Sequence, residues 1–180
     1  MRAAVIAMLA VLLTACGSTS PVASTTPTPS PIGEPTPHQS PLIPCLPTQG
    51  GTSSRATIAD VRVGTHTGYD RVVVEFTGGM PAYKLDWQDP KTFVGPAKGT
   101  PVSVAGVAGL HLYIYGMDIP PAYQHGTNMS TPAYPVLRQV VVLGVYEGQA
   151  DIAIGLGRIV CPTISTMTGP DRLVLDFVTT

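Results

Sequence analysis

The sequence carries the stretch Asp70-Arg71-Val72-Val73-Val74-Glu75-Phe76, which constrains the expected fold more than any other segment. Side chains of a β-strand point alternately to its two faces, so every second residue shares a face. One face of this strand therefore carries two valines and Phe76, and the other carries Arg71, a valine and Glu75. We predict that the face with Phe76 is buried in a core.

A near copy lies close to the C-terminus, with the sequence Asp171-Arg172-Leu173-Val174-Leu175-Asp176-Phe177. In each stretch the arginine and the second acid share a face but stand about 13 Å apart, so they can pair only with a neighbouring strand. Two interpretations remain open. Either two amphipathic strands resemble each other by chance, or two halves of a sandwich each contribute one matching strand.

The sequence around and between these stretches also predicts strands joined by tight turns. Turns are indicated at Gly68 and at Gly78-Gly79, and Leu110-His111-Leu112-Tyr113-Ile114-Tyr115 alternates strictly between aliphatic and ring-bearing residues. No segment shows a convincing helical period. We predict an all-β fold, a β-sandwich or partly open barrel of two similar antiparallel halves, preceded by a disordered tether.

The first residues predict a secretory leader that ends in a lipid-modified cysteine. Arg2 precedes a short apolar run, which closes with Leu13-Thr14-Ala15-Cys16. The run is too short for the roughly 20 residues that span a bilayer. We therefore expect a lipoprotein signal peptide at 1–15 and lipidation of Cys16, which would hold the protein on the extracytoplasmic face of the cell membrane. The alternative is an ordinary cleaved signal peptide with Cys16 as a plain thiol.

Residues 16–44 have the composition of a lipidated tether rather than of a folded segment. Ser, Thr and Pro dominate, as in Ser24-Thr25-Thr26-Pro27-Thr28-Pro29-Ser30-Pro31. Such a segment lacks the apolar content to offset the entropy of ordering, and its prolines favour an extended spacer. The folded domain is accordingly expected at 45–180.

Two of the three cysteines remain once Cys16 is assigned to lipid. Cys45 and Cys161 form an even pair in an oxidising compartment, which predicts a disulfide. The alternative is two separate buried thiols.

Composition and motifs argue against several classes of function. The net charge is −1 with only 12% charged residues, so nucleic acid is not an expected partner. The histidines lack metal-ligand spacing, and there is no phosphate-loop or nucleophile-elbow motif. The acids Asp86 and Asp151, with others near strand ends, are interpreted as solvated groups rather than a catalytic pair. We expect no enzymatic activity, no cofactor and no metal site.

The segment 116–135 is unusually long for a loop in a compact domain, and loops of this length tend to be functional or disordered. Aromatic rings beside amides and hydroxyls suit sugar or peptide binding. The alternative is a plain crossover between two sheets, packed by its own Tyr and Pro residues. Charged residues of the two matching strands join the ring-bearing residues in the predicted ligand-binding set, which comprises Arg71, Glu75, Tyr113, Tyr115, Tyr123, His125, Tyr134, Arg172 and Asp176.

Several of these motifs together resemble the AMIN-like domain of bacterial cell-envelope lipoproteins. The resemblance rests on Tyr69-Asp70-Arg71-Val72-Val73-Val74-Glu75-Phe76, on Gly79-Met80-Pro81-Ala82-Tyr83 and on the C-terminal copy, and it spans about residues 56–180. It implies a β-sandwich of two similar halves. AMIN domains accompany cell-wall amidases and secretins and are thought to bind peptidoglycan, and the resemblance offers no catalytic residues.

The expected function is a non-enzymatic, lipid-anchored binding module of the cell envelope, with peptidoglycan or another wall glycan as ligand. The alternative is a protein-interaction or assembly module that docks an envelope enzyme or transporter through a sheet edge or the 116–135 loop.

Overall fold

The computed structural model describes residues 45–88, 91–97, 99–118 and 127–180. The predicted signal peptide, Cys16 and the tether lie outside these residues. The described part is built from strands, and none of it forms a helix of the length and apolarity that a membrane span requires.

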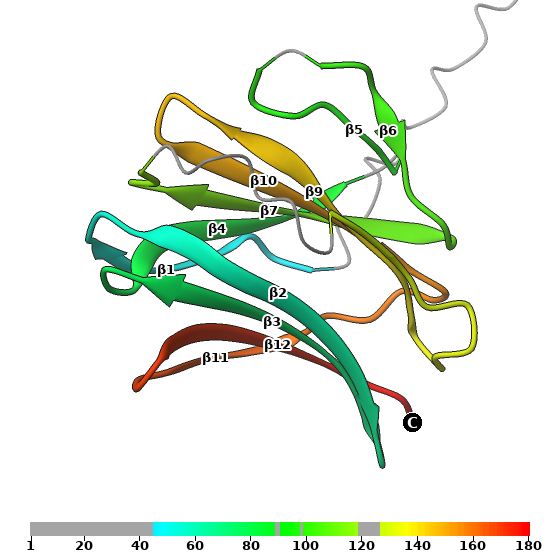
Figure 1. Ribbon diagram of the computed structural model, residues 1–180. Coiled ribbons are helices and arrows are strands. Elements are labelled where there is room, and N and C mark those ends of the chain that lie inside the picture. Colours follow the sequence, from blue (N-terminus) through cyan, green and yellow to red (C-terminus); the bar gives the residue numbers. More distant parts are fainter. Residues whose placement is uncertain (1–44, 89–90, 98, 119–126) are drawn as a thin grey trace, which may run out of the picture. The chain divides into compact units, whose positions relative to one another are not determined.

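Two antiparallel sheets pack face to face, as the sequence predicted (Figure 1). We call the six-stranded one the large sheet, and its strands follow the order β1 (Thr48–Ser53), β4 (Pro81–Gln88), β7 (Ala108–Tyr115), β10 (Gln149–Leu156), β9 (Leu137–Tyr146) and β8 (Asn128–Ser130). We call the four-stranded one the small sheet, and its order is β11 (Thr163–Met167), β12 (Asp171–Val178), β3 (Tyr69–Thr77) and β2 (Thr57–His66). The fold is therefore an all-β sandwich.

Tight turns with positive backbone φ join neighbouring strands. The β9–β10 hairpin turns through Glu147 and Gly148, with φ of 47° and 81°. Two consecutive positive φ angles match the right-handed twist of a hairpin, and glycine adopts them without steric cost.

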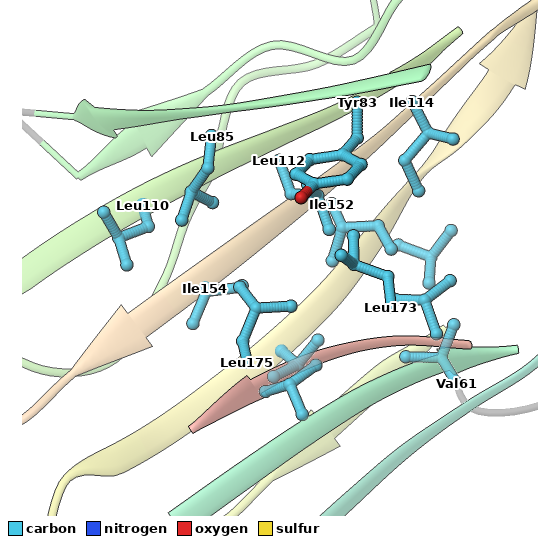
Figure 2. Close-up of a cluster of buried hydrophobic side chains, with 14 of the residues drawn as sticks. Val61, Tyr83, Leu85, Leu110, Leu112, Ile114, Ile152, Ile154, Leu173 and Leu175 are labelled. Atoms are coloured by element: carbon cyan, nitrogen blue, oxygen red, sulfur yellow. The ribbon is translucent and has the colours of Figure 1, made fainter. Parts of the chain in front are cut away.

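The core lies between the inner faces of the two sheets (Figure 2). Leu110, Leu112 and Ile114 of the large sheet face Leu173 and Leu175 of the small sheet, and all five are at most 1% exposed. The alternation in the sequence had predicted which face of each matching strand is buried. That prediction is confirmed for Val72, Val74, Phe76, Leu173, Leu175 and Phe177.

The two matching strands, β3 and β12, are antiparallel neighbours in the small sheet. Their register places Val73 opposite Val174 at the centre and pairs Arg71 with Asp176. It also places Glu75 opposite Arg172, so each arginine of the repeat stands opposite an acid, although only Arg71 bonds to that acid. The echo in the sequence is thus a local two-fold symmetry within one sheet.

One buried carboxylate joins the two sheets. Asp70 belongs to the inner face of β3 and is fully buried. Its Oδ2 accepts hydrogen bonds from the backbone N–H groups of Val136 and Leu137, at 2.7 and 2.9 Å. These two hydrogen bonds satisfy Oδ2, whereas Oδ1 is buried without a hydrogen-bond partner among the described residues.

The predicted disulfide is present between Cys45 and Cys161, whose Cα atoms are 5.5 Å apart. It closes a span of 116 residues and fixes the start of the domain to the connection between β10 and β11. The domain therefore begins at a covalent anchor point.

A small hairpin, β5 (Thr92–Phe93) and β6 (Val102–Ser103), lies on the outer side of the large sheet (Figure 1). Two glycines of the sheet make room for it. A Cβ at Gly109 would lie 2.8 Å from Phe93 Cζ, and one at Gly155 would lie 2.1 Å from the carbonyl oxygen of Ala105. Without side chains at these positions, the hairpin covers one end of the outer face and leaves the other end open.

Candidate functional site

The outer face of the large sheet carries polar and aromatic residues where its inner face carries aliphatic ones. Strand alternation requires this: Leu112 and Ile114 point inward, so the residues between and after them point outward. We call this surface the polar face, and it comprises Lys84, Asp86, His111, Tyr113, Tyr115, Tyr146, Gln149 and Asp151.

Two exposed tyrosines stand in one row at the open end of the polar face. Gln149 pairs in register with Tyr115 of β7 on one side and with Tyr146 of β9 on the other. Two strand spacings separate the tyrosines, about 10 Å. Their exposures are 39% and 47%, so both rings are available to a ligand. Strand pairing fixes the backbone of both residues and therefore the spacing between them.

Two buried side chains of the polar face, Asp151 and His111, lie next to this row. Asp151 and His111 are 2% and 5% exposed. His111 Nε2 lies 3.2 Å from Asp151 Oδ2 but away from the direction of a good hydrogen bond. Asp151 Oδ1 accepts a 2.7 Å hydrogen bond from Gln149 Nε2. Asp151 thereby holds the Gln149 amide that stands between the two tyrosines.

Tyr113 connects the buried pair to the charged edge of the polar face. Its ring stacks on His111 with centroids 3.9 Å apart, and its register partners are Lys84 and Asp151. Burial raises the pKa of the Tyr113 phenol, and the negative charges of Asp86 and Asp151 raise it further. The phenol therefore stays protonated and can donate a hydrogen bond.

Lys84 and Asp86 form the remaining charges of the polar face. Lys84 Nζ lies 2.5 Å from Asp86 Oδ2, and this hydrogen bond raises the pKa of Lys84. The lysine ammonium also lies 5.8 Å from the centroid of the Tyr113 ring. A cation, an anion and several ring faces are thus offered on one rigid surface.

The outer face of the small sheet carries a different arrangement, dominated by ion pairs. Arg71 donates two hydrogen bonds to the carboxylate of Asp176, at 2.6 and 2.7 Å. Arg62 of β2 donates to Glu75 at 2.8 Å, which raises the pKa of Arg62. Glu75 is therefore engaged by β2, and Arg172, its register partner, instead donates to the carbonyl oxygen of Pro170 at 3.3 Å.

The structure does not bring the predicted ligand-binding residues into one site. Tyr113 and Tyr115 lie on the polar face, whereas Arg71, Glu75, Arg172 and Asp176 lie on the outer face of the small sheet, across the sandwich. Tyr134 packs against the core near the start of β9, where Arg138 Nη1 donates to its carbonyl oxygen. Tyr123 and His125 lie outside the described residues. The long loop that motivated several of these predictions is only partly described, and its residues Asn128–Ser130 form β8.

Sequence reasoning missed most of the polar face. Nothing in the sequence singled out Tyr146, Gln149 or Lys84. The interpretation of Asp151 as a solvated acid is wrong, because Asp151 is 2% exposed and lies beside the buried His111. Only the pairing of β7 with β10 brings the last two together. The alternation within β7 was visible in the sequence, but the strands that lie beside β7, namely β4 and β10, were not.

A cavity of about 240 Å³ lies beside the disulfide, apart from both outer faces. Thr48 is its one polar side chain, and the rest of its lining is apolar or disulfide-bonded: Cys45, Leu46, Leu85, Trp87, Leu110, Cys161 and Pro162. This cavity offers no pair of titratable groups for acid–base chemistry. Among the described residues, no three His, Cys, Asp or Glu side chains come together as they would to hold a metal ion.

The family model for the AMIN-like domain matches residues 56–179, which is most of the chain and nearly all of the sandwich. No curated protein matches the chain.

Proposed function

Because the chain belongs to the AMIN-like domain family, a family of binding or targeting modules associated with the bacterial envelope, we propose that it is a non-enzymatic glycan-binding module. Its ligand is peptidoglycan or another wall glycan, bound on the polar face. The protein is held on the extracytoplasmic side of the cell membrane by lipid at Cys16.

The observation that carries this proposal is the row formed by Tyr115, Gln149 and Tyr146. Aromatic rings provide large contact areas at low entropic cost, and a polar handle lies at their edge. Two such rings about 10 Å apart, with an amide between them, suit a chain of successive rings better than one small ligand. Asp86 and Lys84 beside them offer an acceptor and a donor for hydroxyl or amide groups.

Sedimentation of the full chain with purified peptidoglycan tests the proposed site. We expect Tyr115→Ala and Tyr146→Ala each to weaken binding about tenfold, which corresponds to roughly 1.4 kcal/mol. The matched control is Tyr69→Ala, because Tyr69 is an aromatic residue on the outer face of the small sheet, stacked on His66. Equal loss in all three variants, or no binding by the unmodified chain, would contradict a glycan site on the polar face.

A substitution on the outer face of the small sheet tests whether the glycan binds there rather than on the polar face. Arg71→Ala removes the ion pair with Asp176 but leaves the polar face intact. If this variant loses binding while Tyr115→Ala keeps it, the glycan lies on the small sheet instead. Circular dichroism of each variant separates lost binding from lost folding.

The anchor is tested separately at Cys16. Thioether formation with a diacylglyceryl group requires the cysteine thiol, so Cys16→Ala is expected to release the protein from the membrane fraction or to stall its maturation. Acyl chains contribute about 0.8 kcal/mol per buried methylene, and more than one chain holds a protein stably. Unchanged membrane retention and unchanged acyl labelling would remove the lipid anchor from the proposal.

A further inference from the structure

The two sheets have four edge strands, and three of them carry features that oppose pairing with another chain. Natural sheets protect their edges with charges, prolines, bulges or very short strands. β8 is only three residues long. β1 contains Gly50-Gly51 and a register shift at Thr52/Ser53. β2 has a register shift between Ile58 and Asp60 and carries a charged pair, Asp60 and Arg62.

β11 has none of these features. Its five residues are Thr-Ile-Ser-Thr-Met, without a charge, a proline, a glycine or a bulge. It pairs with β12 on one side, and within the described part of the chain no strand lies on its other side. Thr163, Ser165, Thr166 and Met167 are exposed. The disulfide at Cys161, two residues before the strand, holds this edge in place.

From this contrast between the edges we infer that β11 pairs antiparallel with β11 of a second copy of this chain. The two-fold axis passes beside Ser165, so that the two small sheets form one continuous sheet across the pair. Strand addition of this kind uses main-chain hydrogen bonds for affinity and side-chain fit for specificity.

The sequence of β11 is complementary to itself in this register. Ser165 faces its own copy, Ile164 faces Thr166, and Thr163 faces Met167. No charged side chain of β11 meets another one, because the strand has none. On β12, Asp176 is the register partner of Thr163 and Arg172 that of Met167. In each row across the axis these two charges lie three strand spacings apart, about 14 Å, so they neither favour nor oppose the pairing.

This pairing leaves the polar face open. That face belongs to the large sheet, whereas β11 is the edge of the small sheet. A pair of copies would thus present two glycan sites, and the pairing does not depend on whether those sites bind glycan.

Disulfide trapping in the full chain tests the register. Opposed residues of an antiparallel pair have Cβ atoms about 4.5–5.5 Å apart, close enough for a disulfide after small adjustment. Ser165→Cys places two thiols at the axis and is expected to give a disulfide-linked dimer as the main species on a non-reducing gel. Thr163→Cys is the matched control, on the same face of the same strand. In the proposed register, the substituted residue 163 of one copy lies four residues along the strand, about 13 Å, from residue 163 of the other copy. We therefore expect this variant to remain monomeric.

A second substitution on the Ser165→Cys background tests whether strand pairing brings the thiols together. Thr166→Lys adds a charge to an exposed position opposite Ile164 of the other copy, and we expect it to lower the dimer fraction at least fivefold. Equal trapping at positions 163 and 165, or trapping that Thr166→Lys leaves unchanged, would overturn the pairing. A Ser165→Cys chain that stays monomeric, or that links to a different protein, would overturn it as well. Peptidoglycan sedimentation of the same variants shows separately whether the glycan site is intact.

Discussion

Asp70 Oδ2 accepts the backbone N–H of Leu137 at 2.9 Å, and this contact links the small sheet to the large one through a single buried oxygen. The partner residue in the repeated sequence, Asp171, stands opposite Phe76 and is partly exposed. Two aspartates at equivalent positions of two matching strands thus have different environments, because only β3 has the start of β9 above it.

Asp70→Ala should lower the free energy of unfolding by about 2–6 kcal/mol, since two buried N–H groups lose their acceptor at roughly 1–3 kcal/mol each. The matched control is Asp171→Ala, for which we expect less than about 0.5 kcal/mol. Urea denaturation of the two variants measures the difference. Similar losses at both positions would show that the contact between the sheets adds nothing.

Truncation of the core phenylalanines should be among the most damaging substitutions. Phe76 and Phe177 are at most 2% exposed, and Phe→Ala in a core costs about 3–5 kcal/mol. That loss approaches the whole stability of an ordinary domain. Val178→Ala, at an exposed position of the same strand, should change stability little. Chemical denaturation followed by Trp87 fluorescence would measure each effect, and a mild effect at Phe177 would mean that the site repacks.

The Arg71–Asp176 pair should contribute little to stability despite its two hydrogen bonds. Its side chains are 31% and 24% exposed, and exposed ion pairs contribute about 0–1 kcal/mol. A double-mutant cycle with Arg71→Ala and Asp176→Ala should therefore give a coupling energy below about 1 kcal/mol, smaller at high salt. A coupling above 2 kcal/mol would indicate a desolvated pair.

Removal of the disulfide should destabilise the domain strongly. For a span of 116 residues the chain-entropy model gives about 5 kcal/mol. Cys45→Ser with Cys161→Ser is expected to lower the unfolding midpoint, as is reduction of the native protein. Thiol reagents should label neither cysteine in the folded, unreduced chain, and labelling there would contradict the bond.

Alkaline pH should weaken the fold through buried tyrosines. Burial raises the pKa of Tyr113 above its ordinary value of 10.0. The unfolded chain therefore loses this proton first, so the stability is fully present below about pH 10 and is lost as the pH rises through the folded pKa. Tyr113→Phe should lose less stability than the unmodified chain between pH 9 and pH 11. Tyr83, whose pKa burial also raises, remains in both proteins as an internal reference.

The register of the matching strands could be predicted from sequence because alternation is a local property. Phe76 and Phe177 needed no knowledge of their neighbours to be placed in the core. Val174 was expected on the outer face and does point there, yet it is only 2% exposed. Its burial depends on lateral neighbours, Val73 on one side and Ser165 on the other, which a single strand does not reveal.

The candidate site was harder to predict because its residues meet only through sheet order. Tyr115 and Tyr146 are far apart in the sequence and share a row because β7, β10 and β9 are neighbours. The predicted set mixed residues from the two outer faces for the same reason. A pattern within a strand predicts its face, but not which sheet carries that face.

The disulfide also determines how the domain bears tension. Any pull that arrives along the chain preceding Cys45 reaches a residue bonded to Cys161 before it reaches β1. The load therefore divides between an edge strand of one sheet and the connection that leads into the other. A strand such as β1, which a direct pull would peel from β4 one residue at a time, is relieved of part of that force while the bond is intact.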